Sequence, residues 1–151
     1  MNLAAFLIRH QVYFEFLKKR PTRHALEASQ VSGVALNEIV KTIVFLDQDA
    51  KPMIAVVRGD RNVSRHKLQH CSSSKSVRLA SDEMAKAATG YSTGGIPPVG
   101  HKKQLPVFLD EGLISKEYVW CGGGARSKLV RLRTEDIVKL SAATVCDIAT
   151  L

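Results

Sequence analysis

The stretch EIVKTIVFLDQDAKPMIAVVR, residues 38–58, decides the class of fold. Its first part, 38–47, and its last part, 52–58, are rich in β-branched and other apolar residues, which favour strands. The polar segment DQDAKP between them has the composition of a turn. The two parts are therefore predicted to pair as a β-hairpin.

Lys41 is the unusual residue of this hairpin. Side chains alternate between the two faces of a strand. One face then carries Lys41 with Ile39, Ile43 and Phe45, and the other carries Val40, Thr42, Val44 and Leu46. Because both faces are apolar, the strand is predicted to be central and covered on both sides. A lysine in such a place often meets an anion or a carbonyl in a pocket, since desolvating an ammonium is costly. A lysine at a strand end whose head reaches water is the alternative.

The rest of the chain alternates helix and strand patterns without a linker or an internal repeat. Ser64 and Ser81 are expected to cap helices, and Thr134 is expected to open the last one. Helices are predicted over 2–10, 24–33, 64–71, 81–88 and 134–140, and further strands over 12–19, 76–80, 105–109, 117–121 and within 121–133. This pattern predicts one α+β domain over residues 1–151, with a central mixed, mostly antiparallel β-sheet flanked by helices.

The chain is strongly basic, with 22 Lys and Arg against 14 Asp and Glu and a net charge of +8. Such an excess on a small domain favours a polyanionic partner, although solubility alone is an alternative reading. Nucleic acid fits better than a membrane, because no stretch approaches the roughly 20 apolar residues of a spanning helix. Cys71, Cys121 and Cys146 are widely spaced and no export signal is visible. They are therefore expected to be reduced thiols in a cytoplasmic protein.

The segment GYSTGGIPPVGH, residues 90–101, is dense in glycine and proline. Glycines allow main-chain N–H groups to approach a ligand closely, and prolines hold a loop in one shape. The segment could equally be a rigid turn. It has neither the Walker nor the Rossmann spacing, so no nucleotide cofactor is expected.

Several motifs together resemble the YbaK/ProX family. They are VKTIVF at 40–45, VRLASDEM at 77–84, GYSTGGIPPVGHKKQLPVFLDE at 90–111, a Gly-rich turn and strand at 122–132, and VCDIA at 145–149. They cover nearly the whole chain in the expected order. Members of this family are aminoacyl-tRNA deacylases, either free-standing or inserted in prolyl-tRNA synthetase.

The resemblance implies hydrolysis of a small, wrongly attached amino acid from tRNA(Pro), with alanine ahead of cysteine, and an association with prolyl-tRNA synthetase. Lys41 lies at the place of the family's essential lysine, and Gly94 to Pro98 is similar to its G-x-x-x-P substrate loop. The residues implied to bind substrate are Gly94, Gly95, Ile96, Pro98, His101 and His24. Two departures affect specificity: His24 stands where many relatives have Thr, and Leu129 where many have an acidic residue.

The charge pattern and the resemblance together suggest where tRNA binds. The candidate cations are Arg58, Arg61, Arg65, Lys67, Lys102, Lys103, Arg126, Lys128, Arg131 and Arg133. Two other functions stay open: a non-catalytic RNA-binding or synthetase-associated module on the same fold, and a zinc hydrolase using His66 and His70. These two histidines would share a helix face, but no third ligand stands at a known spacing, so no metal site is expected.

Overall fold

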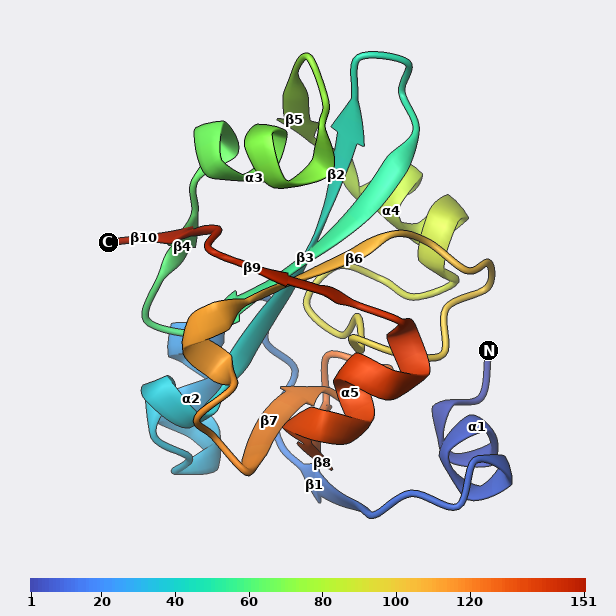
Figure 1. Ribbon diagram of the computed structural model, residues 1–151. Coiled ribbons are helices and arrows are strands. Elements are labelled where there is room, and N and C mark those ends of the chain that lie inside the picture. The colour runs from blue at the N-terminus through green and yellow to red at the C-terminus, as the bar shows by residue number, and fades with distance from the viewer.

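The computed structural model describes residues 1–151, and its longest ribbon is the predicted hairpin. Strands β2 (Val40–Asp47) and β3 (Pro52–Arg58) pair antiparallel. The side chain of Asp47 closes the turn by accepting from the N–H groups of Asp49 and Lys51, at 2.8 and 2.9 Å. The hairpin crosses the middle of the molecule and is visibly twisted (Figure 1).

The hairpin forms part of a five-stranded sheet in the order β5-β2-β3-β6-β9. Strand β5 (Val77–Leu79) pairs antiparallel with β2, whereas β6 (Val107–Asp110) and β9 (Thr144–Cys146) continue the sheet in parallel. The middle strands are buried on both faces, which is why they read as continuous apolar runs.

A second sheet, in the order β1-β8-β7, lies beside the start of the hairpin. Its strands β1 (Phe14–Lys18), β7 (Tyr118–Gly122) and β8 (Lys128–Arg133) are all antiparallel. In Figure 1 this sheet is at the bottom, close to helix α5 (Thr134–Ser141). Two short strands, β4 (Asn62–Val63) and β10 (Ala149–Thr150), form a third sheet.

The predicted class is confirmed, and five of the seven strand pairings are antiparallel. The central mixed sheet is the five-stranded one, and the other strands form two smaller sheets that the sequence did not predict. Only an isolated bridge between Ile39 and Trp120 joins the β1-β8-β7 sheet to the hairpin. Trp120 is half-buried against the small apolar cluster of Ala28, Ile39 and Leu129, which agrees with a packing role.

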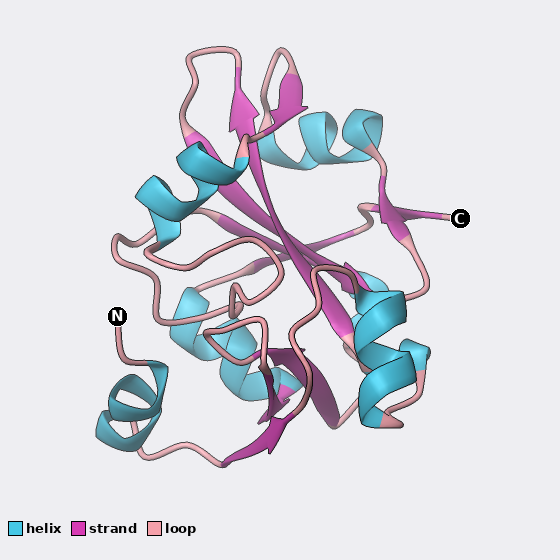
Figure 2. Ribbon diagram, turned by 180° about the vertical axis from the view of Figure 1, so that it is seen from behind, coloured by secondary structure: helices cyan, strands magenta, loops and turns pink.

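The remaining helices are α1 (Leu3–Arg9), α2 (Ala25–Ser32), α3 (Arg65–Ser72) and α4 (Asp82–Thr89), with 3-10 turns at Leu36–Glu38 and Glu111–Leu113. Ser64 and Ser81 cap α3 and α4 as predicted, each accepting an N–H bond of 3.2 Å. Thr134 is the first residue of α5, but its hydroxyl is buried without a partner and caps nothing. Seen from behind, loops occupy the middle of the molecule beside the long strands (Figure 2).

Strand β2 is covered on both faces, as its sequence predicts. Val40, Val44 and Leu46 belong to the main core, whereas Phe45 lies in a second core on the opposite face, with Ile43 packed against it. None of the helices has the length and apolar composition needed to cross a membrane.

The cysteine prediction is wrong for two of the three residues. Cys71 and Cys146, 75 residues apart in the sequence, form a disulfide that ties α3 to β9. Both pack against the second core, and this proximity comes from the strand order rather than from their spacing in the sequence. Cys121 is a free thiol, and complete burial raises its pKa because the thiolate would be desolvated.

Candidate functional site

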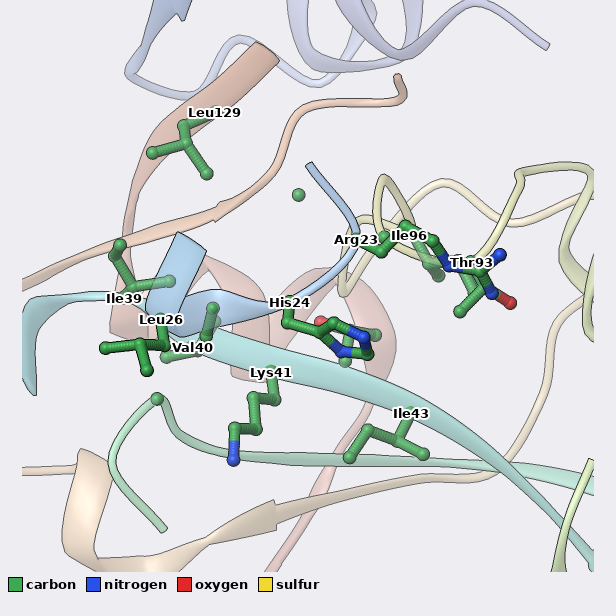
Figure 3. Close-up of a pocket in the computed structure, with 15 residues that line it drawn as sticks. Arg23, His24, Leu26, Ile39, Val40, Lys41, Ile43, Thr93, Ile96 and Leu129 are labelled. Atoms are coloured by element: carbon green, nitrogen blue, oxygen red, sulfur yellow. The ribbon is translucent and has the colours of Figure 1, made fainter. Parts of the chain in front are cut away.

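A cavity of about 290 Å³ lies where β2, the start of α2 and the loop of residues 93–96 meet. Four of the candidate catalytic and substrate-binding residues line it together: Lys41, His24, Gly94 and Ile96. Figure 3 shows Lys41 and Ile43 on the same side of β2, with the His24 ring on the side of the loop that carries Thr93 and Ile96. The size is near the lower end of the range for small-molecule sites.

The cavity opens on an uncovered part of the edge of β2. Ile39 O accepts from Gly59 N on the β3 side, and Val44 O accepts from Ala80 N on the β5 side. Main-chain groups alternate between the two edges of a strand. Those of Thr42 therefore point to the β5 side, although β5 pairs only with residues 45–47.

Thr42 is the functional candidate that the sequence reasoning missed. It lines the cavity, and its buried hydroxyl has no hydrogen-bond partner in the protein. Unpaired buried polar groups are uncommon and costly, so a bound ligand is a natural partner. The signal in the sequence was weak, because a threonine beside a lysine in a strand is ordinary.

Lys41 is half-buried, and its ammonium reaches the segment after β3. Its Nζ donates to Arg61 O at 2.6 Å and to Asn62 Oδ1 at 3.3 Å. Burial lowers the pKa of Lys41, and the nearby carboxylate of Asp60 partly opposes this shift. An ammonium has three N–H donors, so one is not used by the protein.

The loop of residues 93–96, which also lines the cavity, has main-chain donors that the protein does not use. The N–H groups of Gly94 and Ile96 donate no hydrogen bond within the protein. The N–H of Gly95 is already bound to Ser92 O at 3.0 Å, and Gly95 does not line the cavity. The donors available to a ligand are thus those on either side of Gly95.

The glycines of this loop are needed for contacts with the protein's own main chain. A Cβ at Gly95 would lie 2.6 Å from the carbonyl carbon of Ala125, and one at Gly94 would lie 2.9 Å from Cα of Arg23. Gly94 also has φ +93°, which strains other residues. Close ligand approach, the reason expected from the sequence, is not the only reason for glycine here.

The wall of the cavity is largely apolar around these polar groups. Leu26, Ile39, Ile43, Ile96 and Leu129 all line it. His24 and Leu129, the two departures from the family pattern, are therefore both placed at the cavity. No carboxylate, serine or cysteine lines it, so the protein offers no acidic nucleophile or thiol there.

Pro98 and His101 do not line this cavity. His101 borders a separate, smaller one of about 90 Å³ near Phe6, and its Nε2 is 2.6 Å from Pro97 O. This contact therefore holds the proline segment of the loop in shape from outside the cavity that Lys41 lines. Burial lowers the pKa of His101, and the contact with Pro97 O opposes this effect.

The lowered pKa of His101 predicts a loss of stability in mild acid. The unfolded chain takes up a proton below a pH of about 6.5, before the folded protein does, so acid favours unfolding through this residue. We expect the urea midpoint to fall as the pH is lowered from about 6.5 towards the folded-state pKa. His101→Gln keeps an N–H donor for Pro97 O and should flatten this dependence. An unchanged slope in the variant would contradict the prediction.

The ten candidate tRNA-binding cations differ in whether their charge already interacts with another group of the protein. Arg58 forms an ion pair with Asp60, and Lys67 forms one with Asp147 at 3.0 Å. Arg131 and Arg133 stack on Tyr118, with guanidinium carbons 4.2 and 5.3 Å from its ring centroid. Arg126 is bonded to a residue that lines the cavity, because its Nε donates to Thr93 O at 2.7 Å.

The zinc alternative lacks a ligand set. No group of three or more His, Cys, Asp or Glu side chains is placed to hold a metal ion. Cys71, the residue next to His70, is in the disulfide with Cys146.

Comparison with known proteins shows which family this chain matches. The family described as "Aminoacyl-tRNA editing domain" matches residues 19–140. EbsC of Enterococcus faecalis, provisionally named a Cys-tRNA(Pro)/Cys-tRNA(Cys) deacylase, is 28% identical over 91% of this chain and 84% of its own. A proline–tRNA ligase of Maridesulfovibrio salexigens is 35% identical over 68% of this chain, which corresponds to only 17% of the ligase.

Solved structures agree with these sequence matches. A crystal structure described provisionally as a trans-editing enzyme for prolyl-tRNA synthetase superposes with a TM-score of 0.83 and 28% identity, covering 100% of this chain and 99% of the other. The hypothetical protein APE2540 superposes with a TM-score of 0.89, also at 28% identity, covering 98% and 99%.

Proposed function

This chain belongs to the aminoacyl-tRNA editing domain family, and we propose that it hydrolyses the ester between a small amino acid and a wrongly charged tRNA. One observation carries the proposal: Lys41, Thr42 and the free N–H groups of the loop line one cavity. The cavity combines a cation, unpaired polar groups and an apolar wall. The proposed ester hydrolysis uses all three features: the cation, the unpaired polar groups and the apolar wall.

The reaction requires a water molecule to attack the ester carbonyl and donors to stabilise the oxyanion that forms. The N–H groups of Gly94 and Ile96 are the candidate donors, because no group of the protein uses them. The free N–H of Lys41 can hold the ester end or the terminal adenosine. Since no carboxylate or thiol lines the cavity, we assign proton transfer to water or to a hydroxyl of the terminal ribose.

The apolar wall favours small side chains such as those of alanine and cysteine. Both fit where proline fits, so a synthetase for proline cannot exclude them by bulk. The sequence ranked alanine first, and this ranking is not confirmed. The relative EbsC carries cysteine in its name, which supports cysteine as the first substrate to test. We propose tRNA(Pro) as the carrier and prolyl-tRNA synthetase as a partner, because synthetases for proline contain matching segments.

A deacylation panel tests this proposal. We expect cysteine and alanine to be released from tRNA(Pro) at least about tenfold faster than threonine, whose extra bulk meets the wall of isoleucines and leucines. The measurement is the initial rate with cysteinyl-, alanyl-, seryl- and threonyl-tRNA at equal concentration. Prolyl-tRNA(Pro) is the control, and its ester must not be hydrolysed. Rapid release of proline, or no release of any of the four, would reject the proposed editing function.

A further inference from the structure

Two basic segments meet at the edge of the cavity and are bonded to each other. Residues 18–23 start at the last residue of β1, and residues 123–128 lead from β7 to the first residue of β8. Lys19 N donates to Ser127 O at 2.8 Å, and Thr22 N donates to Arg126 O at 3.1 Å. We call their cations the basic rim: Lys18, Lys19, Arg20, Arg23, Arg126 and Lys128.

Three members of the basic rim hold the two segments and the substrate loop together. Lys19 Nζ donates to Arg126 O at 2.6 Å and to Thr22 Oγ1 at 2.7 Å. Arg126 in turn donates to Thr93 O, and Arg23 is paired with Asp82 at 2.7 Å. These three cations are therefore already bonded to other groups of the protein, and their bonds fix the basic rim beside the cavity.

The other three, Lys18, Arg20 and Lys128, form no ion pair with any carboxylate. Lys18 and Arg20 are exposed, and Lys128 lies over the Phe16 ring, 5.1 Å from its centroid. Lys18 and Lys128 are also directly opposite each other in the β1–β8 register. Like charges in that position destabilise a sheet, so an external anion is the group that would relieve them.

The basic rim is continuous with the cavity. Arg23, Thr93 and Gly94 line the cavity, and Arg126 is bonded to Thr93. A molecule whose reactive end enters the cavity therefore leaves it beside the two bonded segments that also carry Lys18, Arg20 and Lys128. A polynucleotide attached to an aminoacyl ester has phosphates at that place.

We propose that the basic rim binds the sugar–phosphate backbone of the tRNA acceptor end, with Lys18, Arg20 and Lys128 each facing a phosphate. The proposal rests on the proposed function, because the ester in the cavity sets the direction of the chain. It assigns tRNA docking to residues 18–20. None of the ten cations chosen from the sequence lies in this segment. It also separates these cations from Arg58 and Lys67, whose charges are already paired.

The test is the affinity for uncharged tRNA of a triple variant, Lys18→Gln, Arg20→Gln and Lys128→Gln. We expect affinity to fall at least about tenfold near 0.1 M salt, because three phosphate contacts are lost. The slope of log affinity against log salt should become shallower by about two, as expected for three contacts to a single strand. In deacylation, KM should rise while kcat is kept, since no cavity residue is changed.

The matched control is the triple variant Lys51→Gln, Lys75→Gln and Arg78→Gln. It also removes two lysines and one arginine, from exposed positions in the turn of the hairpin, just before β5 and on β5. We expect its affinity and salt slope to stay close to those of the wild type. Equal tRNA affinities and salt slopes of the two triple variants, with an active wild-type enzyme, would overturn the proposed role of the basic rim but not the proposed function. A wild-type protein that binds tRNA through the rim but releases no amino acid would instead reject the proposed function.

Discussion

Replacing Lys41 by alanine is expected to lower kcat/KM for deacylation at least about 100-fold, the size of effect seen when one transition-state donor is removed. The ammonium is the only cation of β2 in the cavity, and one of its N–H groups is free for substrate. The protein should stay folded. Removing a half-buried charge also removes its desolvation cost, which offsets the loss of the bonds to Arg61 and Asn62.

The measurement pairs single-turnover deacylation with urea unfolding. Lys67→Ala is the matched control, because Lys67 also donates to a main-chain carbonyl, Ala149 O at 2.8 Å, but does not line the cavity. We expect the control to keep its rate. A folded Lys41→Ala protein with wild-type turnover would remove Lys41 from the site and favour the non-catalytic RNA-binding alternative.

Gly94→Ala is expected to cost both activity and stability, because the new methyl group meets main chain. Its Cβ would lie 2.9 Å from Cα of Arg23 and 3.0 Å from Thr22 O, and neither atom can move without shifting the rim of the cavity. Left-handed strain adds about 1 kcal/mol, and overpacking adds about 1–3 kcal/mol. The displaced loop should lower the deacylation rate at least about tenfold, since the donors at Gly94 and Ile96 move with it.

Gly33→Ala separates strain from collision. Gly33 has φ +78° at the end of α2, similar to +93° at Gly94, but a Cβ there would meet nothing within 4 Å. This variant should lose only the strain energy and keep its rate. If the two variants lose equal stability and both stay active, the loop is not the wall of a working pocket.

The local pattern of the sequence was enough to predict most of the elements. The β-branched runs on both sides of DQDAKP predicted the hairpin, and Ser64 and Ser81 predicted two helix starts, because these features depend on neighbours along the chain. Alternation along β2 also predicted correctly that both faces are buried. The roles of Lys41, His24 and the loop residues stay predictions, although the structure brings four of them to one cavity.

Tertiary structure alone decided the features that join distant segments. The disulfide between Cys71 and Cys146 exists because α3 and β9 pack on one core. His101 lines a different cavity from Lys41, and its ring nitrogen lies 2.6 Å from Pro97 O, which only the path of the loop decides. The basic rim needs the antiparallel pairing of β1 with β8, which sets Lys18 against Lys128 across 110 residues of sequence. The opening at Thr42 depends on where β5 stops pairing with β2. Sequence periodicity specifies which face of a strand is buried, whereas the neighbours along its edge are chosen by the packing of the whole chain.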